Sequence, residues 1–233
     1  MVRSRTIRHH FRFSVSKMSN ALIAIPGEIV TSDSVAEVCG AYIDGRLVSH
    51  SKRYHPKLGD VIIGVVVHKT ADFYRVDIGS GTSAILSNVD FNGATKRHKP
   101  TLALGAPVLC YVTLADPHLD IELSCEDKTT QRDWSSGETL FGPLTSTNPS
   151  LLVDVPVSYS KLLQSSTINS TLASLSRHFK FEISVGANGK TWIAGVTRRE
   201  VLAISKILTQ SQSLTPVQVE AFTRAIQQNL DQN

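Results

Sequence analysis

The chain has 233 residues, and its hydrophobic fraction of 41% and charged fraction of 19% are ordinary for a globular protein with one large domain or two to three small ones. No stretch approaches the length of apolar sequence that crosses a bilayer, so the sequence predicts no membrane span. The formal net charge of +4 arises in residues 1–17, and without that segment 19 basic residues stand against 20 acidic ones, which excludes an argument for nucleic-acid binding from overall charge alone.

Residues 1–17, "MVRSRTIRHHFRFSVSK", form a basic segment with no acidic residue. We expect a disordered extension, although a translation start at Met18 or an arginine-rich organelle presequence would fit the same composition. Arginines in such an arm could also contact phosphate without folding.

The three cysteines, Cys39, Cys110 and Cys125, are far apart, with no C-x-x-C pair and no histidine at ligand spacing. This spacing indicates a reducing compartment and predicts neither a zinc site nor another cofactor.

Residues 18–55 are predicted to form a small N-terminal β-domain. Pro26-Gly27 reads as a turn, and "AYIDGRLVSH" reads as a hairpin around Asp44-Gly45, because Asp-Gly suits the two positive φ angles of a type I′ turn.

Residues 56–128 are predicted to form a β-barrel. Turns separate five segments that alternate or are rich in β-branched residues: "GDVIIGVVVH", "FYRVDIG", "SAILSNVDF", "GAPVLCYVTLAD" and "DIELSC". Five strands in about 70 residues, with almost no helical periodicity, indicate a small closed barrel of the OB type.

Residues 129–149 are rich in Ser, Thr, Gly and Pro and read as a connector, which Trp134, Leu140 and Phe141 are expected to pin to a neighbouring surface. From residue 150 to residue 233 the period changes, and the predicted order is β-α-α-β-β-α with a terminal helix that opens on a capping box at Thr215 to Gln218. This is the order of a type I KH domain, so the chain as a whole is predicted to be an α+β multi-domain protein.

The stretch "VGANGKTW" (185–192) contains a Gly-x-x-Gly motif, by which KH domains clamp an RNA backbone between their first two helices. Here the motif lies between two predicted strands, and the helix junction "QSSTI" has no glycine. Asn188-Gly189 is a strong hairpin signal, so Gly186, Asn188 and Gly189 are predicted to form a turn. Lys190 beside them remains a candidate for RNA contact, and Trp192 is expected to bury its ring against the core or a neighbouring domain.

The loop "GATKRHKP" (93–100) carries Lys96, Arg97, His98 and Lys99 in succession, with no acidic residue nearby. Such a loop is either a solvated loop or a patch that follows phosphates along a single strand of RNA, and composition favours neither. Tyr74 and its neighbour Phe73 are candidates for stacking on bases, although residues of a barrel strand are as often core.

The segment "PKLGDVIIGVV…YRVDIGSGTSAILSNVDF…LGAPVLCYVTLAD…IELSC" resembles an S1 RNA-binding domain, through its G-D-x-x-x-G start, its V-D-I-G turn and its I-x-L-S strand. Together with "FNGATKRHKP", "VGANGKTWIAG" and the preceding β-rich unit, it resembles the S1/KH cap subunits of the eukaryotic RNA exosome. Arg75 and Ser87 depart from the generic S1 pattern, which often has an aromatic residue and a histidine there.

The resemblance implies a non-catalytic subunit in the nucleus, nucleolus and cytoplasm, which guides single-stranded RNA into a central channel for 3′→5′ processing and degradation, ribosomal RNA included. The implied partners are a ring of RNase PH-like proteins, other S1-domain cap subunits and a 3′→5′ exonuclease. It implies that Lys96, Arg97 and Lys99 face the pore, that the N-terminal unit contacts the ring, and that a set of motif residues serves S1–KH packing: Gly186, Asn188, Gly189 and Trp192.

Two other functions compete with this interpretation. A free-standing S1/KH protein that binds single-stranded RNA would have the same domains. An enzyme is disfavoured: Asp116, Asp120 and Glu122 gather near the end of the barrel, but turns and strand ends commonly hold such residues, and no nucleophile, metal or phosphate-binding motif appears.

Overall fold

The computed structural model describes residues 40–43, 46–49, 53–116, 118–127, 132–136, 139–164, 170–212 and 214–231. The chain divides into two compact units, residues 1–49 and 50–233. In the first unit, β1 (Gly40–Ile43) and β2 (Arg46–Ser49) form an antiparallel hairpin in which Ile43 is opposite Arg46, at the place where the sequence predicts one. The basic segment 1–17, the Pro26-Gly27 turn, Cys39 and the Asp44-Gly45 turn lie outside the described residues.

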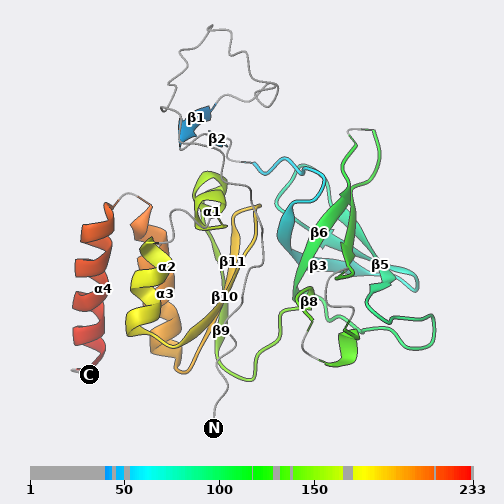
Figure 1. Ribbon diagram of the computed structural model, residues 1–233. Coiled ribbons are helices and arrows are strands. Elements are labelled where there is room, and N and C mark those ends of the chain that lie inside the picture. The colour runs from blue at the N-terminus through cyan, green and yellow to red at the C-terminus, as the bar shows by residue number, and fades with distance from the viewer. Residues whose placement is uncertain are drawn as a thin grey trace, which may run out of the picture. The chain divides into compact units, whose positions relative to one another are not determined.

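A closed five-stranded barrel begins the second unit (Figure 1). Around the barrel each strand pairs with the next in the order β3-β4-β5-β7-β6, and β6 pairs back onto β3. Only the β5–β7 pair is parallel. This order confirms the predicted OB-type barrel. The strands are β3 (Val61–Lys69), β4 (Phe73–Asp77), β5 (Ala84–Phe91), β6 (Pro107–Leu114) and β7 (Glu122–Cys125).

Side chains that point inward from the barrel strands form the core of the barrel. In β4, Tyr74 and Val76 are buried, whereas Arg75 is exposed and Phe73 is half-buried. A side chain at Gly64 of β3 would overlap the Val76 side chain, so the close approach of β3 and β4 requires glycine there.

The connector lies against the barrel. It contains the short 3-10 helix η1 (Trp134–Ser136) and the two-residue strand β8 (Gly142–Pro143), which extends the sheet beside β6. Trp134 and Phe141 pack against the barrel core, as expected of pinning residues. Leu140 is 44% exposed, so the expectation that it also pins the connector is wrong.

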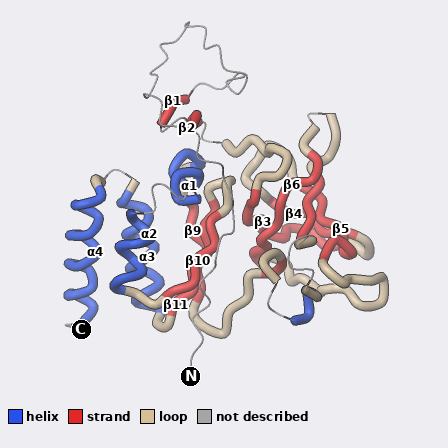
Figure 2. Tube along the Cα trace, viewed as in Figure 1, coloured by secondary structure: helices blue, strands red, loops and turns tan. Residues whose placement is uncertain are grey.

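The C-terminal domain has the predicted order β-α-α-β-β-α plus a terminal helix. Its three strands form an antiparallel sheet in the order β10-β11-β9, and Figure 2 shows the helices α2, α3 and α4 beside this sheet, on the side away from the barrel. The elements are β9 (Ser150–Asp154), α1 (Val157–Gln164), α2 (Ser170–His178), β10 (Phe181–Val185), β11 (Lys190–Gly195), α3 (Arg198–Ser211) and α4 (Pro216–Asp231).

Helix starts in this domain follow local sequence. At α4 the backbone N–H of Thr215 donates to Oε1 of Gln218 at 2.9 Å, which is half of the predicted capping box. At α3 both halves of a capping box are present between Thr197 and Glu200, and this box is not among those predicted from the sequence. Helix α4 packs on α2 and α3 and completes the hydrophobic core of the C-terminal domain.

Candidate functional site

The Gly-x-Asn-Gly motif closes the β10–β11 hairpin. The N–H of Gly186 donates to the carbonyl of Lys190 at 2.8 Å, and the N–H of Gly189 donates to the carbonyl of Gly186 at 3.2 Å. Gly189 has a φ of +86°, the left-handed region that glycine adopts without strain. The motif is therefore a turn between strands, as predicted.

This turn also continues the hydrogen-bond ladder along one edge of β3. Strand β4 ends at Asp77, opposite Val65, so the backbone of Ile63 lies beyond the end of β4. Nδ2 of Asn188 donates to the carbonyl of Ile63 at 2.8 Å, and Oδ1 of Asn188 accepts from the N–H of Ile63 at 3.3 Å. One step further, the N–H of Ala187 donates to the carbonyl of Val61 at 2.8 Å.

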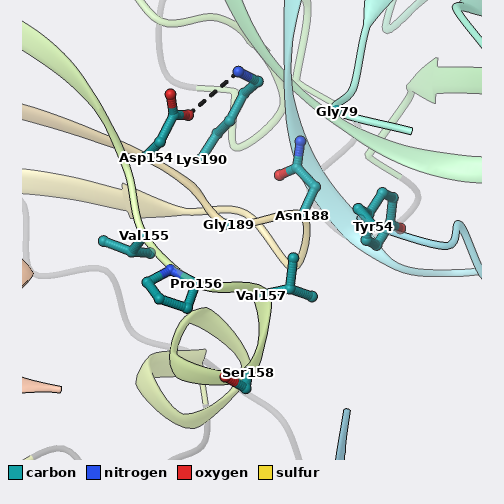
Figure 3. A pocket seen from close by; sticks show the side chains of 10 residues that line it. All are labelled: Tyr54, Gly79, Asp154, Val155, Pro156, Val157, Ser158, Asn188, Gly189 and Lys190. Atoms are coloured by element: carbon teal, nitrogen blue, oxygen red, sulfur yellow. Dashed lines mark hydrogen bonds and ion pairs between the residues drawn. The ribbon is translucent and has the colours of Figure 1, made fainter. Parts of the chain in front are cut away.

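The Asn188 side chain is therefore a bridge between the two domains. Its Nδ2 also donates to the carbonyl of Ile78 at 2.9 Å, and the residue is 6% exposed. Figure 3 shows its amide between the hairpin turn and the barrel. A single side chain supplies three hydrogen bonds to barrel backbone that would otherwise be buried without partners.

The two glycines let the turn approach this closely. A Cβ on Gly186 would lie 2.6 Å from the nitrogen of Ile63 and would overlap Oδ1 of Asn188. A Cβ on Gly189 would overlap the carbonyl oxygen of Val155. Both positions therefore require glycine for space, and Gly189 requires it for its φ as well.

Trp192 adds an apolar contact to the same junction. Its ring is 5% exposed and belongs to a cluster with Ile63 and Leu109 of the barrel and Ala194 of β11. Phe141 of the connector packs against this cluster. The ring is buried between domains, so it is not a stacking platform for a base.

Lys190 lies at an open groove of about 530 Å³ between the two domains (Figure 3). Its Nζ is 3.3 Å from Oδ1 of Asp154, and its side chain is 16% exposed. The carboxylate partly neutralises this cation, so Lys190 is a weaker candidate for phosphate contact than the sequence implied. RNA contact by Lys190 stays a prediction.

Tyr54 lines the groove from the barrel side. Its hydroxyl donates to Oδ2 of Asp60 at 2.8 Å. Burial, together with the Asp60 carboxylate, raises the pKa of Tyr54 far above its usual value. The phenol therefore stays protonated and serves as a hydrogen-bond donor within the fold.

In the basic loop, His98 and Lys99 contact other parts of the fold, whereas Lys96 and Arg97 do not within the described residues. Thr95 and His98 exchange backbone hydrogen bonds of 2.8 and 3.1 Å, which close a tight turn at the tip. Nζ of Lys99 donates to the carbonyl of Ala71 at 2.7 Å, and the ring of His98 lies 5.0 Å from the ring of Trp134.

Lys96 and Arg97, at the tip of this turn, are exposed. Within the described part of the chain neither has an ion-pair or hydrogen-bond partner. Of the four candidates, these two side chains are exposed at the tip, whereas Lys99 keeps its charge beside them but is held by the carbonyl of Ala71.

The prediction that Tyr74 stacks on a base is wrong. Tyr74 is 1% exposed, its hydroxyl donates to the carbonyl of Pro100 at 2.9 Å, and it accepts from the N–H of Leu102 at 3.3 Å. It anchors the segment that leaves the basic loop. The outward-facing aromatic of this strand is Phe73, opposite Ser87 of β5.

The acidic residues near the end of the barrel do not gather into a metal site. The described residues contain no group of three or more His, Cys, Asp or Glu side chains placed to hold a metal ion. Oδ1 of Asp116 accepts from the N–H of His118 at 2.8 Å, which is a local turn contact.

No helix in the described part of the chain has the length and apolar character needed to cross a membrane.

Family models match both domains of the second unit. The S1 domain of exosome complex component RRP40 matches residues 54–137, and a KH domain matches residues 151–199. A solved structure of a provisionally assigned exosome complex RNA-binding protein has a TM-score of 0.56 and 19% identity, covering 76% of this chain and 98% of its own. At that identity it supports the fold alone.

Curated relatives agree with the domain matches. A Dictyostelium discoideum protein provisionally named exosome complex component rrp40 is 33% identical over 174 residues, which cover 75% of this chain and 69% of that protein. Exosome complex component RRP40 of Saccharomyces cerevisiae is 34% identical over 70% of this chain and 64% of its own length. The Homo sapiens RRP40 is 28% identical over 72% of this chain and 58% of its own length.

The aligned part of the chain thus spans between 58% and 69% of these three relatives. The matches place an S1 domain and then a KH domain, in the order of the barrel and the C-terminal domain of the structure. The chain belongs to the RRP40 family of exosome complex components.

Proposed function

We propose that this chain is a non-catalytic RNA-binding cap subunit of an RNA exosome, in which it guides single-stranded RNA toward 3′→5′ processing and degradation. Membership of the RRP40 family supports the assembly, and the S1 barrel with its basic loop supports the RNA contact. Its partners would be RNase PH-like ring subunits, other S1-domain subunits and a 3′→5′ exonuclease. Its location would be the nucleus, the nucleolus and the cytoplasm.

The observation that carries the RNA contact is the pair Lys96 and Arg97 at the tip of a closed turn. Both cations are exposed, and the residues beside them are held by Ala71 and Trp134. Two phosphate contacts on a single strand correspond to a salt slope of about −1.4, which is roughly a sevenfold loss of affinity between 50 and 200 mM salt. Two phosphate contacts contribute only modestly to affinity, which suits a subunit that binds RNA within an assembly.

A non-catalytic role fits the chemistry of the site. Asp116 makes a local turn contact, Glu122 begins strand β7, and the titratable groups Tyr54 and Lys190 at the junction make structural contacts. The competing function is a free-standing S1/KH RNA-binding protein, which would keep the same loop but would not assemble with ring subunits.

Affinity purification of the tagged chain from its own cells, with mass spectrometry for stoichiometry, tests the assembly. Equimolar recovery with RNase PH-like and other S1 subunits supports the cap function. Recovery of the chain alone, or with ribosomes, refutes it.

Equilibrium binding of the purified complex to labelled single-stranded oligouridine, measured between 50 and 200 mM salt, tests the RNA contact. Lys96→Ala/Arg97→Ala should lower the salt slope by about 1.4, because two phosphate contacts are removed. Arg199→Ala/Lys206→Ala is a matched control, since both side chains are exposed cations of α3. Equal slopes for the wild type and the loop variant would refute RNA contact by the loop.

A further inference from the structure

The connector holds the first end of the basic loop. Asn92 and Asp127 form two hydrogen bonds: Nδ2 of Asn92 donates to the Asp127 carbonyl at 3.1 Å, and the Asp127 N–H donates to Oδ1 of Asn92 at 2.9 Å. The N–H of Trp134 donates to the carbonyl of Asn92 at 2.9 Å. Asp127, just before the connector, and Trp134, within it, thus converge on the residue just before Gly93.

The same connector holds the other end of the loop. The rings of His98 and Trp134 are 5.0 Å apart at an interplanar angle of 37°. At the first end of the loop, Gly93 has a φ of +73°, and a Cβ there would lie 2.9 Å from Oδ2 of Asp133 in the connector. Hydrogen bonds from Ser135 lower the pKa of Asp133, and the nearby His98 lowers it further.

Packing, rather than a polar contact, fixes the Trp134 ring. The ring is partly buried against the barrel core. Its Nε1 is buried and has no hydrogen-bond partner in the described residues. An aromatic replacement without the N–H would therefore lose no hydrogen bond, although a smaller ring would lose some contact area.

From these contacts we propose that Trp134 and Asn92 are positioning residues that hold the basic loop, with Lys96 and Arg97 at its tip, in the conformation that meets RNA. This proposal rests on the proposed RNA contact of the loop. Neither residue supplies charge to the RNA. Their effect is to order the loop in advance, so that less conformational entropy is lost when RNA binds.

Trp134→Ala, compared with Trp134→Phe, tests the proposal on the complex purified with the full chain. Affinity is measured with labelled oligouridine at low salt, at a temperature where circular dichroism shows each variant folded. Trp134→Ala should lose most of the affinity that Lys96→Ala/Arg97→Ala loses, and Trp134→Phe should restore at least half of it. A variant that only loosened the barrel would lower the melting temperature and leave the affinity of the folded protein unchanged.

A double-mutant cycle separates positioning from independent contact. When the two cations are already alanine, Trp134→Ala should reduce affinity by less than twofold, because the two exposed cations at the tip are no longer there to be positioned. A full additional loss in the triple variant would overturn the proposal. If Trp134→Ala fails to fold, Asn92→Ala serves in its place, since it removes the two side-chain hydrogen bonds to Asp127 and leaves both rings.

The two proposals fail in different ways. Unchanged affinity in Lys96→Ala/Arg97→Ala refutes RNA contact by the loop, and with it the positioning role. A loss in that variant combined with wild-type affinity in Trp134→Ala and Asn92→Ala refutes positioning alone. Equal losses in Trp134→Ala and Trp134→Phe would also refute it, because the stacked ring would then not be what holds the loop.

Discussion

Asn188→Ala is the sharpest test of how the two domains are joined. The substitution removes the amide that donates to Ile63 and Ile78 and accepts from Ile63, at distances of 2.8, 2.9 and 3.3 Å. The change is therefore confined to three hydrogen bonds and the small space that the amide occupied.

The expected loss is about 3 kcal/mol in the free energy of unfolding, because each hydrogen bond contributes about 1 kcal/mol net. Ile63 is 0% exposed, so its N–H and carbonyl would be left in a dry site, and the cost is not reduced by water. For a folded unit of this size, that loss lowers the melting temperature by about 6–12 °C. Asn188→Asp should cost at least as much, because it puts a buried carboxylate against two carbonyl oxygens.

Urea unfolding followed by tryptophan fluorescence measures the change. The chain has two tryptophans, and a Trp134→Phe background leaves Trp192, at the junction, as the reporter. Asn148→Ala is the control, since Asn148 is exposed and its substitution should change stability by less than about 0.5 kcal/mol. A loss below about 1 kcal/mol for Asn188→Ala would show that the amide does not support the β3 edge.

Two further predictions follow from buried groups. Trp192→Ala should cost about 3–5 kcal/mol and reduce incorporation into the complex, because the ring is 5% exposed between domains; near-normal melting and assembly would contradict this. Burial raises the pKa of Cys110 to about 12 and raises that of Cys125 well above its usual value. Because each folded pKa lies above the unfolded one, the stability linked to each thiol is present below about pH 8.5 and is lost as pH rises toward the folded pKa, by about 2 kcal/mol per thiol at pH 10. Urea unfolding at both pH values checks this, and Cys110→Ala should show a smaller loss than the wild type; an equal loss would mean that the thiol does not contribute.

Local patterns were sufficient to predict much of this fold. The alternation of the strands and the turn residues between them predicted the barrel, and Asn188-Gly189 predicted the hairpin turn, because both depend on neighbours in sequence. The change of period after residue 150 predicted the order of the C-terminal elements for the same reason.

The role of individual side chains depended on contacts that sequence does not reveal. Alternation showed that Phe73 and Tyr74 face opposite sides of a strand, but only barrel closure determines which side is the core. Lys99 reads as a free cation until its bond to Ala71, 28 positions earlier, is known. Asn188 reads as a turn residue, and its bridging role depends on contact with Ile63, 125 positions earlier, which no local pattern reveals.

The geometry of the Gly-x-Asn-Gly turn also explains why we place the proposed RNA contact on the barrel and not on this turn. A phosphate clamp needs backbone N–H groups that are free to donate. Here the N–H groups of Gly186, Ala187 and Gly189 donate to carbonyls of Lys190, Val61 and Gly186. The groups that a clamp would offer are therefore occupied, two in closing the turn and one in joining the domains.

Stability and RNA contact should therefore separate experimentally along this chain. Asn188→Ala weakens the junction while leaving Lys96 and Arg97 in place, and Lys96→Ala/Arg97→Ala removes charge from an exposed turn while leaving the junction intact. The first variant should unfold earlier and, while folded, keep the wild-type salt slope. The second should melt normally and lose about 1.4 from that slope. A junction variant that lost RNA affinity while folded would instead show that the two domains form the RNA surface together.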